Sequence, residues 1–187
     1  MKKIAILASG SGTNAERIAR YFATHPSIGV DMILSNRADA YVLKRAEAMQ
    51  IPTSIFTRQE LADPGGVAAL LERREISLVV LAGFLWLVPP ALLNAFPQKV
   101  INIHPALLPD YGGKNMYGSR VHQAVIEAGE TESGITIHRV NEQYDRGDII
   151  FQARCPVLPG DTIDTLAQRI HELEYQHFPR VIEQLLS

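Results

Sequence analysis

The sequence predicts an α/β fold: a single domain with a mostly parallel central sheet, helices on both faces, and an antiparallel pair of strands near the C-terminus. Three observations favour it. Short runs of β-branched and aliphatic residues alternate with helical patterns through residues 3–104. The run at residues 78–82 is apolar throughout, as in a parallel strand covered on both faces. Two later strand patterns lie too close together for a helical crossover, so we expect them to pair antiparallel.

The N-terminal part supplies five expected strands, at residues 3–8, 30–35, 52–56, 78–82 and 100–104. Helical patterns lie between them at residues 14–24, 41–49, 64–74 and 90–96, whereas the polar segment 57–63 is expected to be a loop. Strands and helices that alternate in this order form right-handed crossovers and a parallel sheet.

The chain changes character after Pro109, with a long loop at residues 110–118 that contains three glycines. Loops of this kind lie on the surface and are often functional. A helix is expected at residues 121–128, then strands at 133–140 and 148–157. A last helix at residues 161–186 is expected to be capped by Asp161 or Thr162, and to be kinked or interrupted at Pro179.

Composition excludes several classes of protein. The length of 187 residues suits one domain with a sizeable core. The 18 Lys and Arg against 20 Asp and Glu give a formal charge of −2, which indicates no nucleic-acid partner. Cys155, the single cysteine, is expected to be a small buried hydrophobe, in keeping with a cytoplasmic location. The N-terminal apolar run is broken by Gly10 and Gly12, so it predicts a strand rather than a signal peptide, and no run is long enough for a membrane span.

The turn at residues 9–14 (SGSGTN) joins the first strand to the first helix, which is the local architecture of an anion site. Backbone N–H groups and the helix dipole both face a ligand at that point. Ala15 stands where a dinucleotide fingerprint has its third glycine, and the lysine of a P-loop is missing, so the turn fits a single phosphate better than a pyrophosphate. The alternative is a tight turn that caps the helix with Thr13 or Asn14.

Asn102 and His104 are polar residues two apart in the apolar strand at residues 100–104. That spacing puts both side chains on one face of a strand, and Pro105 marks the strand end, where ligands bind in open α/β sheets. Asn can donate to a developing oxyanion, and His can transfer a proton near neutral pH. The alternative is a polar strand end with His104 hydrogen-bonded to the backbone.

Other candidates come from loops. Residues 85–88 leave the central strand through Gly83 and suggest a hydrophobic wall for a flat ligand, or ordinary core packing. Asp145, in the loop at 141–147, is the carboxylate placed to join an active site, or simply a turn former. Glu174 falls near the apolar stripe of the last helix and needs a partner if it is buried. The His171–Glu172 and His177 spacing is not a zinc motif, so no metal is expected.

These motifs together resemble the glycinamide ribonucleotide formyltransferases, a folate-dependent family of purine synthesis. The resemblance covers the whole chain and lies in six segments, at residues 9–14, 35–40, 81–84, 102–109 (NIHPALLP), 134–138 and 145–150. It implies one Rossmann-like domain over residues 1–187, with a phosphate-binding half at 1–100 and a catalytic and folate-binding half at 101–187, and no further domain.

The resemblance also implies roles for individual residues. The catalytic residues would be Asn102, His104 and Asp145. Substrate would be bound by Gly12, Thr13, Asn14 and Glu174. The co-substrate 10-formyltetrahydrofolate would be bound by Leu85, Trp86, Leu87, Val88, Asn141 and Tyr144, and the supporting residues would be Thr136 and His138. Two departures stand out: the family commonly has a basic residue where this chain has Trp86, and the loop at residues 111–120 is longer here.

The implied reaction is transfer of the formyl group of 10-formyltetrahydrofolate to the amine of glycinamide ribonucleotide, by direct attack through a tetrahedral intermediate and without a metal. These two small molecules would be the partners of a monomer or homodimer. Three alternatives remain. They are a formyl-tetrahydrofolate-dependent transferase acting on another amine, a nucleotide-binding oxidoreductase, which the incomplete glycine fingerprint disfavours, and a ligand-binding domain without catalysis.

Overall fold

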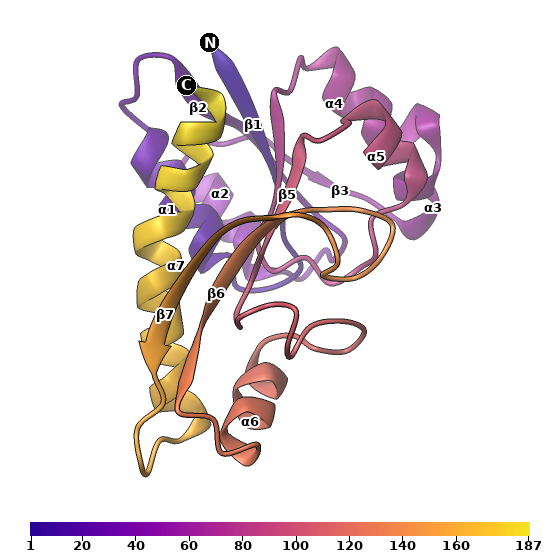
Figure 1. Cartoon of the computed structure of the whole chain (residues 1–187). Coiled ribbons are helices and arrows are strands. Elements are labelled where there is room, and N and C mark those ends of the chain that lie inside the picture. Colours follow the sequence, from indigo (N-terminus) through magenta and orange to yellow (C-terminus); the bar gives the residue numbers. More distant parts are fainter.

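The computed structural model describes residues 1–187 and confirms the α/β fold (Figure 1). Its seven-stranded sheet has the order β3-β2-β1-β4-β5-β6-β7. Strands β1 to β5 pair in parallel, and β5–β6 and β6–β7 pair antiparallel, as the spacing predicts. The strands are β1 (Lys2–Leu7), β2 (Ile28–Ser35), β3 (Thr53–Ile55), β4 (Leu78–Leu81), β5 (Val100–His104), β6 (Glu132–Arg139) and β7 (Ile149–Pro156).

Helices cover both faces of this sheet. They are α1 (Thr13–Phe22), α2 (Tyr41–Ala48), α3 (Arg58–Ala62), the π-type turn η1 (Pro64–Ala68), α4 (Ala69–Arg73), α5 (Pro90–Ala95), α6 (Ser119–Glu127) and α7 (Ile163–Leu186). Figure 1 shows α1 and α7 on one side of the sheet and α3, α4 and α5 on the other.

The core therefore has two parts, one on each face of the sheet. Alternate residues of β1 feed them: Ile4 and Ile6 belong to the cluster beneath α1 and α7, and Ala5 and Leu7 to the cluster beneath α4 and α5. A parallel strand buried on both faces needs such an unbroken apolar run.

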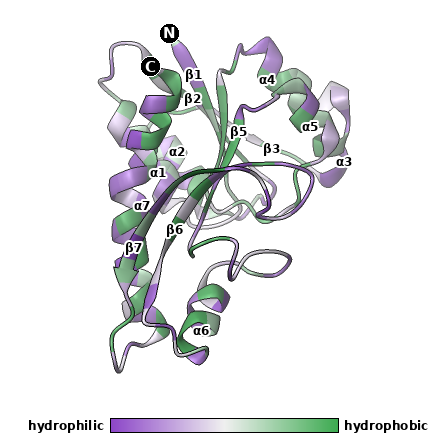
Figure 2. Cartoon of the chain, viewed as in Figure 1, coloured by the Kyte–Doolittle hydropathy of each residue, from purple (hydrophilic) through white to green (hydrophobic).

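Helix α7 runs the length of the molecule. Its banded hydropathy (Figure 2) is that of an amphipathic helix whose apolar stripe lies on the core. Thr162 caps it in a capping box with Thr165, so the predicted cap is confirmed. Of the two outcomes expected at Pro179, a kink or an interruption, the interruption is wrong, because the helix continues through it. Pro179 and its neighbour Phe178 are buried, and this packing holds the helix despite the lost backbone bond.

The expected loop at residues 57–63 is also wrong, since it contains the one-turn-and-a-half helix α3. A capping box starts this helix: the Thr57 side chain accepts from the Glu60 N–H, and Glu60 accepts from the Thr57 N–H. The spacing Thr-x-x-Glu is visible in the sequence and signals such a start. The helix expected at 64–74 is divided in the structure. Its first part is the π-type turn η1, in which Gly66 is non-helical, and the regular α-helix α4 begins only at Ala69.

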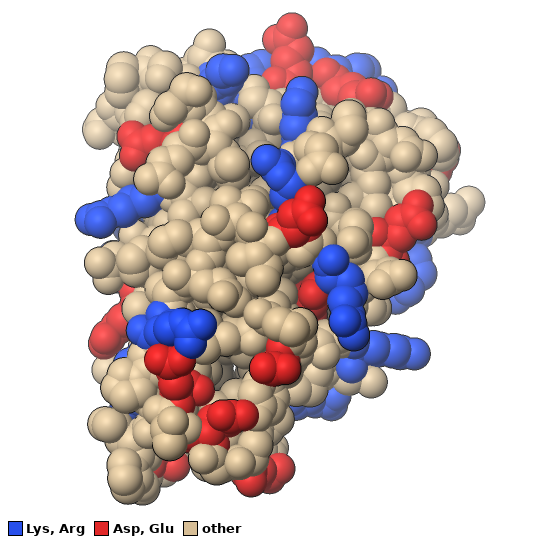
Figure 3. Space-filling view, viewed as in Figure 1, with Lys and Arg blue, Asp and Glu red and all other residues tan.

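The surface carries charges of both signs. On the face seen in Figure 3, basic and acidic side chains are interspersed, and pairs such as Arg154–Glu132 bring opposite charges into contact. No helix combines the length and the apolar character that crossing a bilayer requires.

Candidate active site

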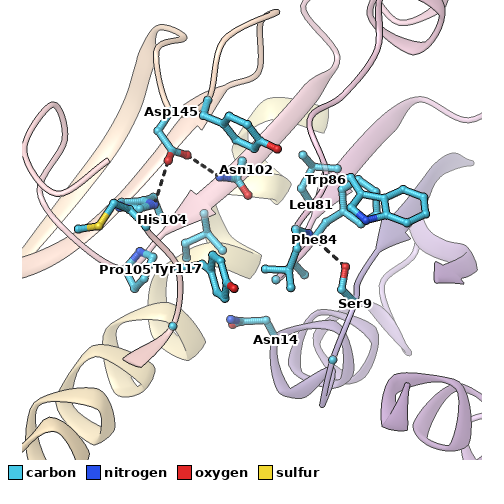
Figure 4. A pocket seen from close by; sticks show the side chains of 18 of the residues that line it. Ser9, Asn14, Leu81, Phe84, Trp86, Asn102, His104, Pro105, Tyr117 and Asp145 are labelled. Atoms are coloured by element: carbon cyan, nitrogen blue, oxygen red, sulfur yellow. Dashed lines mark hydrogen bonds and ion pairs between the residues drawn. The ribbon is translucent and has the colours of Figure 1, made fainter. Parts of the chain in front are cut away.

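A cavity of about 480 Å³ lies where β1, β4 and β5 end. Figure 4 shows side chains from separate parts of the chain that point into it. The structure brings together nearly all the predicted site residues as its lining: Gly12, Thr13, Asn14, Leu85, Trp86, Leu87, Val88, Asn102, His104, His138, Tyr144, Asp145 and Glu174. This is the edge of an open α/β sheet at which ligands are expected.

Asn102 and His138 face each other across β5 and β6, because they are direct partners in the antiparallel register. Asn102 Nδ2 lies 3.1 Å from His138 Nε2. His138 Nδ1 lies 2.8 Å from the Arg139 carbonyl oxygen and must donate to it, so in the neutral ring Nε2 accepts from Asn102. The cross-strand pair thus fixes the orientation of the Asn102 amide.

His104 is buried at the end of β5, with 3% of its surface exposed. Its Nε2 lies 2.8 Å from the Tyr111 carbonyl oxygen, to which it donates. Its Nδ1 lies 3.5 Å from Asp145 Oδ2. The backbone bond considered as an alternative for His104 is therefore present, and it leaves the other ring nitrogen facing the carboxylate.

Asp145 reaches this cluster from the loop between β6 and β7. Its Oδ2 accepts from the Gly113 N–H at 2.9 Å, and its Oδ1 lies 3.5 Å from both His138 Nε2 and Asn102 Nδ2. Gly147 permits the loop to close, because a Cβ there would lie 1.7 Å from the Arg139 carbonyl oxygen.

The protonation states of the cluster follow from burial and charge. Burial lowers the pKa of His104, and this outweighs the opposite effects of Asp145 and the Tyr111 carbonyl. Burial raises the pKa of the Asp145 carboxyl, but His138 and His104 in their protonated forms, with the Gly113 N–H, bring it below its ordinary value. Near neutral pH the site therefore holds an ionised carboxylate beside a neutral imidazole.

The predicted anion loop follows β1. Ser9 ties it to the end of β4, since its N–H donates to the Gly83 carbonyl at 3.0 Å and its Oγ accepts from the Leu85 N–H at 3.1 Å. Gly12 has a φ of 76°, and a Cβ there would lie 2.3 Å from Val42 Cγ2. Gly12 is the N-cap of α1 and offers no side-chain cap, so the alternative of a Thr13 or Asn14 cap is wrong. The first N–H groups of α1 have no side-chain partner, and their residues line the cavity.

Glu174 is the buried carboxylate of α7, with 6% of its surface exposed. Its Oε2 accepts from Asn14 Nδ2 at 2.8 Å, which is the partner that its position on the apolar stripe requires. Burial nevertheless raises the pKa of Glu174 to about 7. A group with this pKa can accept or donate hydrogen bonds near neutral pH.

The segment after β4 forms an apolar wall. Leu85, Leu87 and Val88 all line the cavity; the two leucines keep 40% and 41% of their surface exposed, whereas Val88 is buried. Trp86 packs edge-on against Phe84 and Phe56. The Arg58 guanidinium lies 4.6 Å from the centre of the Trp86 ring, which puts a cation beside this wall.

Two predicted residues lie elsewhere. Asn141 is exposed and does not line the cavity, and its Oδ1 accepts from the Gln143 N–H within the loop. Thr136 is fully buried behind the site, where its hydroxyl donates to the Ala106 carbonyl and accepts from the Leu108 N–H. It holds the segment that follows His104 rather than touching a ligand.

Sequence reasoning missed several lining residues, namely Ser9, Arg37, Lys114, Tyr117, His122, Gln143 and His171. Ser9 belongs to the predicted anion loop, and Tyr117 to the long loop expected to be functional, so both had a signal. His122 and His171 lie on helices whose helical patterns do not show which face lines a cavity.

The fold and this site define a family of transferases. Residues 2–182 match the family described as formyl transferase, and the chain belongs to that family. A Haemophilus influenzae phosphoribosylglycinamide formyltransferase is 41% identical, over 98% of this chain and 86% of that protein. The Bacillus subtilis enzyme of the same name is 37% identical, over 100% and 96% of the two chains. The crystal structure of phosphoribosylglycinamide formyltransferase from Streptococcus pneumoniae TIGR4 has a TM-score of 0.88 at 38% identity and covers 100% of both chains. The resemblance inferred from the motifs is thus confirmed.

Proposed function

We propose that the protein transfers the formyl group of 10-formyltetrahydrofolate to the amine of glycinamide ribonucleotide. One observation carries the proposal: the His104–Asp145 pair, 3.5 Å apart, lines the same cavity as an open helix N-terminus and an apolar wall. A phosphorylated amine and a flat folate can therefore meet at a proton-transfer pair.

Substrate placement follows from the lining. The N–H groups at the start of α1 suit the phosphate. Glu174, which is hydrogen-bonded to Asn14 of α1, suits the ribose hydroxyls. The apolar wall at residues 85–88 suits the folate ring. Holding two substrates in this way can contribute up to about 7–11 kcal/mol to lowering the barrier.

In the first step the amine nitrogen attacks the formyl carbon, and the carbonyl electron pair moves to oxygen. Asn102 is the donor for this oxyanion. His138 holds one hydrogen of its Nδ2. The other makes only a weak contact, since Nδ2 lies 3.5 Å from Asp145 Oδ1, so this hydrogen can turn to the substrate. A donor of this kind is typically worth about 3–4 kcal/mol.

In the second step the bond between the formyl carbon and N10 breaks. A proton must leave the attacking nitrogen and reach N10. His104, neutral near pH 7, accepts it at Nδ1 beside Asp145, whose charge stabilises the imidazolium until the proton passes on. Such acid–base help is worth about 10²–10⁴-fold.

The test is direct. The purified protein is mixed with glycinamide ribonucleotide and 10-formyltetrahydrofolate, and the deformylated folate is followed by absorbance. We expect turnover that requires both substrates. A panel of other amines tests the substrate: faster transfer to another amine, or release of formate without any amine, would contradict the proposal.

A further inference from the structure

One buried imidazole that lines the cavity has no role in the proposed mechanism. His122, in the first turn of α6, has 3% of its surface exposed. Its Nδ1 is buried without any hydrogen-bond partner, and Nε2 makes no hydrogen bond within the chain. Buried polar groups are normally satisfied, because an unpaired one lowers stability.

His122 lines the cavity, as do the first residues of α1. Its neighbours are His104 on β5 and His171 on α7, whose charges add to burial in lowering the pKa of His122 to about 4. His171 stacks on Tyr175 at 5.9 Å, and the Arg17 guanidinium of α1 lies 5.0 Å from that same ring. His122 is therefore close to α7, which contacts α1 through Arg17 and Tyr175.

The start of α6 opens into the same space. Tyr117 and Gly118 line the cavity, and Gly118 is an N-cap without a side-chain hydrogen bond. The N–H groups of Ser119 and Arg120 have no backbone partner, as expected for the first turn of a helix. Figure 4 shows Tyr117 and Asn14 among the side chains around the cavity, and the residues at the starts of α1 and α6 both line it. Two helix N-termini around one space favour an anion.

The chemistry of the ring points the same way. A neutral imidazole carries its hydrogen on one nitrogen, and a bare buried acceptor is tolerated better than a bare buried N–H. The hydrogen therefore belongs on Nε2, and Nδ1 is the bare acceptor. His122 then offers a single donor to a ligand in the cavity.

We infer that His122 is a further substrate-binding residue, whose Nε2–H donates to the phosphate of the substrate between the starts of α1 and α6. This inference rests on the proposed function, which supplies a phosphorylated substrate. The phosphate would then receive a side-chain hydrogen bond from α6 as well as the backbone hydrogen bonds expected from α1.

The test compares two ligands and three variants by calorimetry. The ligands are glycinamide ribonucleotide and its dephosphorylated ribonucleoside. In His122→Leu we expect Kd for the ribonucleotide to rise about 10- to 100-fold, because one charge-assisted hydrogen bond is lost. Kd for the ribonucleoside, which has no phosphate, should stay within about twofold. His122→Gln restores a donor near the Nε2 position and is expected to recover most of the affinity. His177→Leu, on α7 outside the cavity, is the matched control and should bind both ligands like the wild type.

A second readout separates binding from a structural role. Because His122 is unpaired, His122→Leu should unfold at the same or a higher temperature than the wild type. Unchanged ribonucleotide binding, equal losses for both ligands, or a large drop in Tm would each overturn the inference. A wild type that fails to bind the ribonucleotide, but whose His122 ring resonances shift with inorganic phosphate in NMR, would contradict the proposed function and support the anion contact.

Discussion

Glu174 Oε2 accepts a hydrogen bond from Asn14 Nδ2 at 2.8 Å, so the buried carboxylate of α7 holds the first turn of α1. This single bond does not compensate for burial, which raises the pKa of Glu174 from 4.5 to about 7. The carboxylate is thus kept at the site at a cost to stability, as is common for residues that serve a ligand.

That cost gives a pH-dependent prediction. Between pH 4.5 and 7 the folded state binds more protons at Glu174 than the unfolded state, so this residue lowers the free energy of unfolding as pH rises, up to a plateau above pH 7. Glu174→Gln should therefore be more stable than the wild type by up to about 3 kcal/mol at pH 8, and similar to it at pH 4.5. Denaturant unfolding at both pH values measures this, with Glu172→Gln, at an exposed position of the same helix, as the control. An equal effect at both pH values would contradict it.

The buried hydroxyl of Thr136 predicts a large effect on stability. Thr136→Val keeps the shape but leaves the Ala106 carbonyl and the Leu108 N–H without this partner, so we expect a loss of roughly 2–4 kcal/mol. Thr136→Ser retains the hydroxyl and should lose only about 1 kcal/mol. Chemical denaturation measures the difference, and equal losses in the two variants would show that the hydroxyl is not what matters.

The turn at Gly12 predicts a steric effect. Gly12→Ala meets Val42 and adopts a positive φ, so it should destabilise the protein by more than about 1 kcal/mol and displace the start of α1. Gly10→Ala is the matched control, because a Cβ at Gly10 has no atom within 4 Å. Melting temperatures and Kd for glycinamide ribonucleotide check both. A Gly12→Ala protein that melts and binds like the control would disprove this view of the turn.

Asp145 is expected to affect catalysis more than binding. Asp145→Asn removes the charge beside His104 and His138, so kcat should fall about 10²–10⁴-fold while both KM values change little. Steady-state kinetics at saturating substrate measure it. His104→Ala should lose a similar factor, and near-normal turnover in both folded variants would rule out the assigned roles.

Trp86 is expected to act on folate alone. Trp86→Ala removes the aromatic ring that packs against Phe84 and over which the Arg58 guanidinium lies. KM for 10-formyltetrahydrofolate should therefore rise about tenfold. KM for glycinamide ribonucleotide should stay the same, and parallel rises in both would indicate a collapsed cavity instead.

Much of the fold was predictable because its signals are local. The apolar runs of β1 and β4, the helical periods of α1 and α7 and the short connection between β6 and β7 each reflect contacts within a few residues. The failures were local rules overridden by packing, as at Pro179, or a cap that was overlooked, as at Thr57.

The sequence by itself therefore determined the order of the elements, the sheet edge at which ligands are expected, and the residue types available there. Only the tertiary structure decided which of those residues meet: that Asp145 lies against His104, that Asn102 pairs with His138, and that His122 is buried without a partner. The physical reason is that these contacts join segments far apart in the chain. They depend on strand register, loop closure and helix packing, and none of these is set by near neighbours in the sequence.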